Sequence, residues 1–136
     1  MKYVFYFLFI GLLGYSIQSC KKDEGKLPDI EFKTGGNYTS SDLTVSVATI
    51  DTLLIGIHAE KTEEEDVLKH FNVSISLDGA PAVSVYDEDL TGADQDQYDA
   101  DFTYVTPDVP GHYKIICTVT NRDGLTNNVS LTVTAN

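Results

Sequence analysis

Apolar and polar residues alternate with a period of two through most of the chain after Pro28, and this pattern constrains the fold more than any other feature. In residues 71–77, for example, Phe, Val, Ile and Leu are separated by Asn and Ser, and the turn pair Asp78-Gly79 follows. Such alternation places one set of side chains on each face of a half-buried strand. About seven segments of this kind occur, with turn signals between them and no long helical pattern. The sequence therefore predicts an all-β sandwich.

The last two strands are predicted to form a hairpin. Residues 113–119 alternate up to the tight-turn signal of residues 121–124, and residues 129–133 return as the partner strand.

Residues 108–115, 118–124 and 129–133 resemble the C-terminal half of bacterial immunoglobulin-like and PKD-like domains. A Gly-x-Tyr step enters the penultimate strand in those families, and a polar-Asp-Gly turn leads to the last one. The resemblance implies an immunoglobulin-like sandwich of about seven antiparallel strands, with Tyr113 as the corner tyrosine. Ile115 stands where the usual second cysteine would be, and the chain has no Trp. The likeness is therefore to disulfide-free versions of the domain.

One segment departs from the alternation. Thr62-Glu63-Glu64-Glu65 reads as a capping box, in which a Thr is followed three residues later by a Glu, and an acidic run favours the positive end of a helix dipole. We expect a short helical turn here between two strands.

The N-terminus carries an apolar run, residues 4–14, that has the length of a secretory segment and is too short to span a bilayer with ease. Ser19-Cys20 at its end resembles a bacterial lipobox. The resemblance implies cleavage before Cys20 and lipid modification of that cysteine, whereas a signal peptide cut elsewhere would leave Cys20 as an ordinary residue. The predicted organisation is a signal peptide at 1–19, a lipidated flexible tether at 20–27 and one domain at 28–136.

The charged residues 21–24 that follow Cys20 resemble the signal by which lipoproteins of Bacteroidetes reach the cell surface. The likeness implies a lipid-anchored protein of the outer membrane, exposed at the cell surface, with a periplasm-facing position as the alternative.

The charge of the chain restricts its partners. Loss of the signal peptide removes only Lys2 from the nine basic residues, so eight basic and 21 acidic residues remain, a net charge of −13. Such a chain lacks the basic surface that nucleic-acid binding requires, and it would not adsorb to anionic lipid. Contact with the membrane is therefore expected through the lipid anchor alone.

Cys117 has no partner within the chain if Cys20 carries lipid, so no disulfide is expected. It lies in an apolar run with the parity of Ile115 and Val119, and it is predicted to be a small buried hydrophobic residue.

The densest group of candidate ligands lies in residues 87–101, which hold seven carboxylates. Asp, Asp and Thr before a glycine echo the start of a calcium loop, whose hard oxygen ligands alternate. The twelfth position holds Tyr98 instead of a bidentate acid, so a solvated acidic loop is the alternative reading. The candidate calcium ligands are Asp87, Asp89, Thr91, Asp94 and Asp96.

Sugar recognition favours exposed aromatic side chains, and two tyrosines are candidates for it. Tyr38 lies in a Gly-rich loop, and Tyr86 points away from the core by parity, whereas Tyr98 and Tyr104 point inward. Ordinary surface tyrosines are the alternative. Asp51-Thr52-Leu53 resembles the O-glycosylation acceptor of Bacteroidetes secreted proteins, which makes Thr52 a candidate modification site.

No catalytic motif is present, and the three histidines, His58, His70 and His112, show no metal-ligand spacing. The sequence therefore predicts no enzyme and no cofactor beyond a structural calcium ion. It favours a monomeric interaction or spacer domain that meets a protein or glycan partner at the cell surface. A carbohydrate-binding accessory protein of a polysaccharide-uptake system is the alternative.

Overall fold

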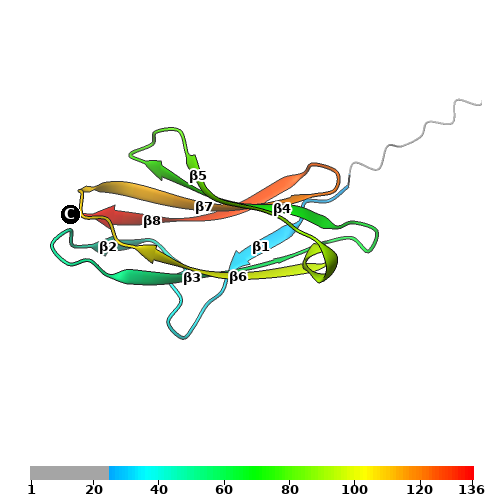
Figure 1. Cartoon of the computed structure of the whole chain (residues 1–136), viewed down its shortest axis with the longest axis horizontal. Coiled ribbons are helices and arrows are strands. Elements are labelled where there is room, and N and C mark those ends of the chain that lie inside the picture. The colour runs from blue at the N-terminus through cyan, green and yellow to red at the C-terminus, as the bar shows by residue number, and fades with distance from the viewer. Residues whose placement is uncertain (1–24) are drawn as a thin grey trace, which may run out of the picture.

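The computed structural model describes residues 25–136, so the predicted signal peptide, Cys20 and most of the tether lie outside the described residues. Within this range the chain is an all-β sandwich of two facing sheets, as the alternation predicted (Figure 1). No helix among these residues is long and apolar enough to cross a bilayer.

The sheets have unequal width. A three-stranded sheet has the order β1 (Asp29–Phe32), β3 (Thr52–Glu60) and β6 (Gln97–Val105). A five-stranded sheet has the order β2 (Leu43–Val45), β8 (Thr126–Ala135), β7 (Gly111–Asn121), β4 (Leu68–Leu77) and β5 (Val83–Asp89). A short 3-10 helix, η1 (Gly92–Gln95), leads into β6. The described residues thus form eight strands, one more than predicted, and β2 pairs with β8 in parallel instead of antiparallel.

The core lies between the two sheets and is built from the inward set of each alternating segment. Ile55 and Ile57 of β3 face Phe71, Ile115 and other apolar side chains of the five-stranded sheet, and these four side chains are fully buried. Cys117 lies in the same core, which confirms its predicted burial, and this burial raises the pKa of its thiol to about 12. The Tyr113 hydroxyl donates a hydrogen bond to the carbonyl of Val109 at 3.0 Å, the contact expected of a corner tyrosine.

A buried polar cluster closes the end of the sandwich at which the chain enters. The amide nitrogen of Asn121 donates to Asp66 Oδ2 at 2.7 Å and to the Lys26 carbonyl at 2.9 Å. Its oxygen accepts from the backbone N–H groups of Asp123 and Leu125. Asn121 and Asp66 are 2% and 1% exposed, so this cluster joins three distant segments where water cannot replace a lost bond.

The predicted helical turn is an ordinary turn. Asp66 N–H donates to the Glu63 carbonyl, and the Thr62 hydroxyl donates to the Leu27 carbonyl at 2.8 Å instead of capping a helix. Long-range contacts thus override the local capping signal. They also hold Leu27 to the domain, so the ordered part begins before the predicted boundary at Pro28.

Replacing Asn121 by Ala should lower the free energy of unfolding by about 3 kcal/mol, because several buried polar groups lose their partner at once. Urea denaturation measures the change. Asn128→Ala on β8 is the matched control, since Asn128 is exposed, and it should change stability by less than about 0.5 kcal/mol. Equal effects of the two substitutions would contradict the role assigned to the Asn121 cluster.

Candidate functional site

An apolar groove runs along one side of the sandwich, between the edge strands β5 and β6. We call it the lateral groove. Its volume is about 670 Å³, within the range of ligand-binding clefts. The side chains that line it include Phe71, Val73, Ile75, Val85 and Tyr86 from β4 and β5, Tyr98, Ala100, Phe102 and Tyr104 from β6, and Ile115 from β7.

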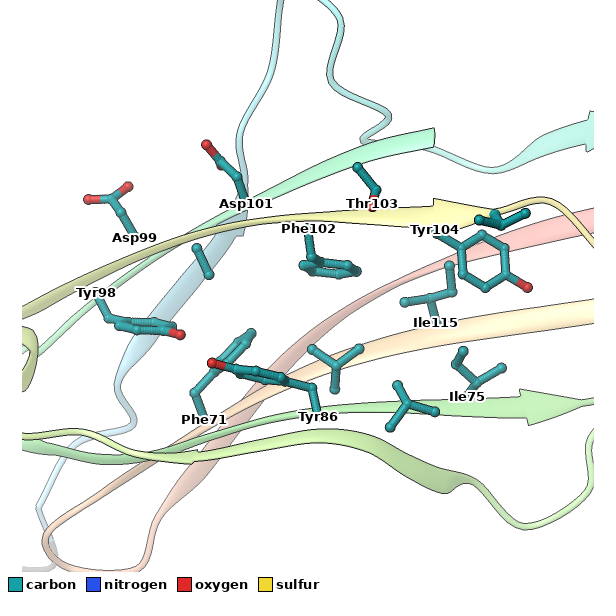
Figure 2. Close-up of a pocket in the computed structure, with 14 residues that line it drawn as sticks. Phe71, Ile75, Tyr86, Tyr98, Asp99, Asp101, Phe102, Thr103, Tyr104 and Ile115 are labelled. Atoms are coloured by element: carbon teal, nitrogen blue, oxygen red, sulfur yellow. The ribbon is translucent and has the colours of Figure 1, made fainter. Parts of the chain in front are cut away.

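The groove exists because the three-stranded sheet does not cover β5. Figure 2 shows Tyr98, Phe102 and Tyr104 pointing from β6 toward Phe71 and Tyr86, while Asp99, Asp101 and Thr103 point away from the groove. This confirms the predicted orientation of the β6 side chains. The inward side chains of β5 remain open to solvent: Val83 is 67% exposed, Val85 58% and Tyr86 48%.

Glu88 joins two tyrosines that line the lateral groove. Its Oε2 accepts hydrogen bonds from the hydroxyls of Tyr86 at 2.5 Å and Tyr98 at 2.7 Å. Because Tyr98 belongs to β6, the second bond links the two sheets, and the Tyr98 ring also packs on Phe71 with centroids 5.0 Å apart. The hydrogen bonds from Tyr86 and Tyr98 lower the pKa of Glu88, which therefore stays ionised at neutral pH.

The predicted orientation of Tyr86 is wrong, although the residue does line the lateral groove. A β-bulge at Val85 shifts the register, so Tyr86 pairs with the buried Val73 and Ser84 pairs with Ser74. One extra residue reverses the faces of all that follow, which parity in the sequence does not reveal. Tyr86 thus faces the groove, with its ring 6.2 Å from that of Phe71.

Tyr38, the other candidate, lies away from the lateral groove. Its ring covers Gly56 on the outer face of the three-stranded sheet, where a Cβ on Gly56 would approach the ring to 2.6 Å. Its hydroxyl donates to Asp101 at 3.0 Å. Tyr38 and Tyr86 are therefore on different faces and do not form one site.

Two of the predicted calcium ligands bind a histidine instead. The His70 ring nitrogens lie 3.0 Å from Asp89 and 2.6 Å from Asp87, on the outer face of β4 and β5. Since both partners are carboxylates, each nitrogen must donate, which is the protonated form of the ring. The contact with Asp89 and then that with Asp87 raise the pKa of His70, against the opposing effect of burial. Asn72 Nδ2 also donates to Asp87 at 3.0 Å.

The calcium prediction is therefore corrected. Asp87 and Asp89 belong to β5, where they pair with Asn72 and His70 of β4, so they do not belong to a loop. Thr91 precedes η1, Asp94 lies within it, and Asp96 forms an ion pair with Lys61 at 2.6 Å. Residues 25–136 contain no group of three or more His, Cys, Asp or Glu side chains placed to hold a metal ion.

The remaining candidates are dispersed. Thr52 is the exposed first residue of β3. His58 contacts Asp99 on the outer face of the three-stranded sheet, while His112 contacts Thr134 on the five-stranded sheet. The O-glycan at Thr52 stays a prediction.

Comparison with known proteins finds no matching family model and no matching curated protein. Several solved structures are similar in shape. A superoxide reductase (neelaredoxin) from Ignicoccus hospitalis is similar at 9% identity and a TM-score of 0.48. The alignment covers 82% of this chain and 81% of the reductase chain. A putative superoxide reductase from Thermotoga maritima covers 81% and 86%, at 13% identity and a TM-score of 0.45. A β-glucosidase from Listeria innocua covers 79% of this chain and 16% of its own, at 10% identity and a TM-score of 0.43.

These matches contradict two sequence predictions, that the chain is no enzyme and that it needs no cofactor beyond calcium. The matched proteins are reductases, so both predictions are withdrawn. Identities of 9–13% and TM-scores below 0.5 do not assign that activity or its cofactor to this chain.

Sequence reasoning missed the lateral groove altogether. Each of its strands reads as an ordinary half-buried segment, and the opening arises from which strands face each other. The one available signal was the valine pair Val83 and Val85, which lies in a short segment between Pro81 and the acidic run.

The pairing of His70 should make stability depend on pH. Because its pKa is raised in the folded chain, the stabilisation is fully present below about pH 6.5 and is lost as the pH rises through the raised value. The ring is partly exposed, so we expect no more than about 1 kcal/mol. Melting temperatures of the wild type and of His70→Gln should differ most at about pH 6, where His70 is protonated in the folded chain. They should converge at about pH 9, where it is neutral. His112→Gln is the control, and a constant difference for His70→Gln across this range would exclude the effect.

Proposed function

We propose that this chain is a lipid-anchored binding module of the outer membrane that captures a partner in its lateral groove. The observation that carries the proposal is the exposed inner face of β5, where Val85 and Tyr86 line a groove that no strand of the described residues covers. Contiguous exposed apolar surface of this kind marks interaction sites on soluble domains.

The sequence around Cys20 supports the location. A lipobox-like step and the charged residues 21–24 resemble those of surface lipoproteins of Bacteroidetes, and the folded domain begins within a few residues of them. An acidic domain gains no attraction to anionic lipid, so the acyl chains would provide the attachment. The groove would then be presented close to the membrane, where a partner in the same membrane or outside it is accessible.

A glycan is the second candidate for the partner. The groove holds the rings of Tyr86, Phe102 and Tyr104, and the Tyr86 hydroxyl already belongs to a hydrogen-bonded pair with a carboxylate. Aromatic faces with adjacent polar groups suit a sugar, which has apolar faces and many hydroxyls.

Replacing Cys20 by Ala should move the protein from the membrane fraction to the soluble fraction of cells, since the acyl chains are the proposed attachment. Cys117→Ala removes the buried thiol instead and should leave the protein in the membrane fraction. Fractionation and immunoblotting measure both. A Cys20→Ala protein that stays with the membrane would refute the anchor.

Capture in the groove is tested by a photo-crosslinking amino acid placed at Val85 of the full chain in cells. We expect adducts from this position and none from Ser130, which is exposed on the outer face of β8. Mass spectrometry of the adduct separates a protein partner from a glycan. Equal labelling from the two positions, or none from Val85, would argue against capture in the groove.

A further inference from the structure

We propose that the partner is an extended peptide segment of another protein that adds as a β-strand to the free edge of β6, with apolar residues alternating with Lys or Arg. This inference rests on the proposed function and identifies the class of partner. It is carried by the edges of the two sheets, the width of the three-stranded sheet and the charges along β6.

Of the edge strands in the described residues, β6 is the one left open to pairing. Proteins protect sheet edges by making them short or by interrupting them with bulges and prolines. β1 has four residues and β2 has three. β5 carries the bulge at Val85 and follows Pro81. β6 runs for nine residues in regular register with β3, with no bulge and no proline, and its other side has no strand partner.

A strand beside β6 would also fill the space that the fold leaves empty. Immunoglobulin sandwiches of the constant type add a fourth strand to the sheet at this edge, in the order A-B-E-D, and β1-β3-β6 corresponds to A-B-E. Here the chain passes from β5 through η1 directly into β6. Neighbouring strands lie about 4.8 Å apart, so an added strand would lie over the inner face of β5. Its inward side chains would contact Val85, Ile75 and Phe102 in the lateral groove.

The charges on β6 select a basic partner. Asp99 and Asp101 point outward from the strand, where they would lie beside the outward residues of an added strand. Lys33 contacts both carboxylates, at 3.2 and 2.9 Å, and His58 contacts Asp99, so one lysine serves two acids. Opposite charges on adjacent strands stabilise pairing and like charges oppose it. A second copy without its signal peptide would bring the same carboxylates and a net charge of −13, which disfavours pairing of two copies.

The probe is a nine-residue capped peptide in which Val and Ile alternate with Lys, titrated by fluorescence anisotropy against the full chain in a nonionic detergent, with empty micelles as the blank. Two further peptides carry N-methyl groups on alternate residues. One is methylated at the odd-numbered positions and the other at the even-numbered positions. A strand directs alternate N–H groups toward its neighbour. We therefore expect one methylated peptide to bind at least about tenfold more weakly than the unmethylated peptide. The other should bind with an affinity within about twofold of it.

The charge requirement is tested on the protein. The double variant Asp99→Asn/Asp101→Asn should bind the peptide about tenfold more weakly and with less dependence on salt. Glu64→Gln/Glu65→Gln changes the net charge equally, on exposed residues of the turn before β4, and should bind as the wild type does. Hydrogen exchange should show that the peptide protects amides of β6 and leaves those of β1 unchanged.

Each other outcome overturns strand addition. Equal binding of both methylated peptides would show that side chains alone dock, and capture in the groove would stand. Binding of oligosaccharides but not of the peptide would assign the groove to glycans. If the chain forms dimers without peptide, and if the β6 amides exchange more slowly in those dimers, a second copy would be the occupant. If the peptide does not bind and Val85 gives no cross-link, the proposed function fails together with this inference.

Discussion

The inner face of the five-stranded sheet is wider than the three-stranded sheet that covers it, and most features of this domain follow from that mismatch. Full burial is reached where β3 faces β4 and β7, and Ile55, Phe71 and Ile115 there have no exposed surface. The apolar set of β5 has no strand opposite it and remains exposed. The Glu88 carboxylate, held by Tyr86 of β5 and Tyr98 of β6, joins the two sheets. The lateral groove lies between the inner faces of β5 and β6.

The end of the sandwich at which the chain enters is different, because polar side chains hold it together there instead of apolar ones. The Asn121 side chain satisfies the backbone of the β7–β8 turn and at the same time holds Asp66 and the Lys26 carbonyl. Buried amides of this kind contribute specificity because no other arrangement satisfies every group. The described chain is thus fixed to the sandwich from Lys26 onward, at the opposite end from the C-terminus (Figure 1). If Cys20 is lipidated, this contact determines how close the domain stays to the membrane.

The sequence correctly predicted the features that follow from alternation within one strand. It missed those that depend on which strands lie next to or opposite each other. The faces of β6 and the burial of Cys117 were correct because period two determines them once a strand forms. Tyr86 was assigned to the wrong face because a bulge has no signature in the alternation of its own strand. The calcium prediction took Asp87 and Asp89 for loop residues, although they continue β5 and bind His70 across to β4. The groove could not be predicted because it results from the order of strands in two sheets, which depends on long-range contacts.

The acidic residues of β5 and β6 have a second consequence for an exposed edge. A long regular edge strand is a template for pairing with any similar strand, and a membrane would concentrate copies of the chain. Carboxylates at Asp99 and Asp101 oppose such pairing because two copies would place like charges side by side. The same charges attract a strand that carries lysine or arginine at those positions. Protection against self-association and selection of a partner can therefore come from the same two side chains, with Lys33 limiting how strong either effect becomes.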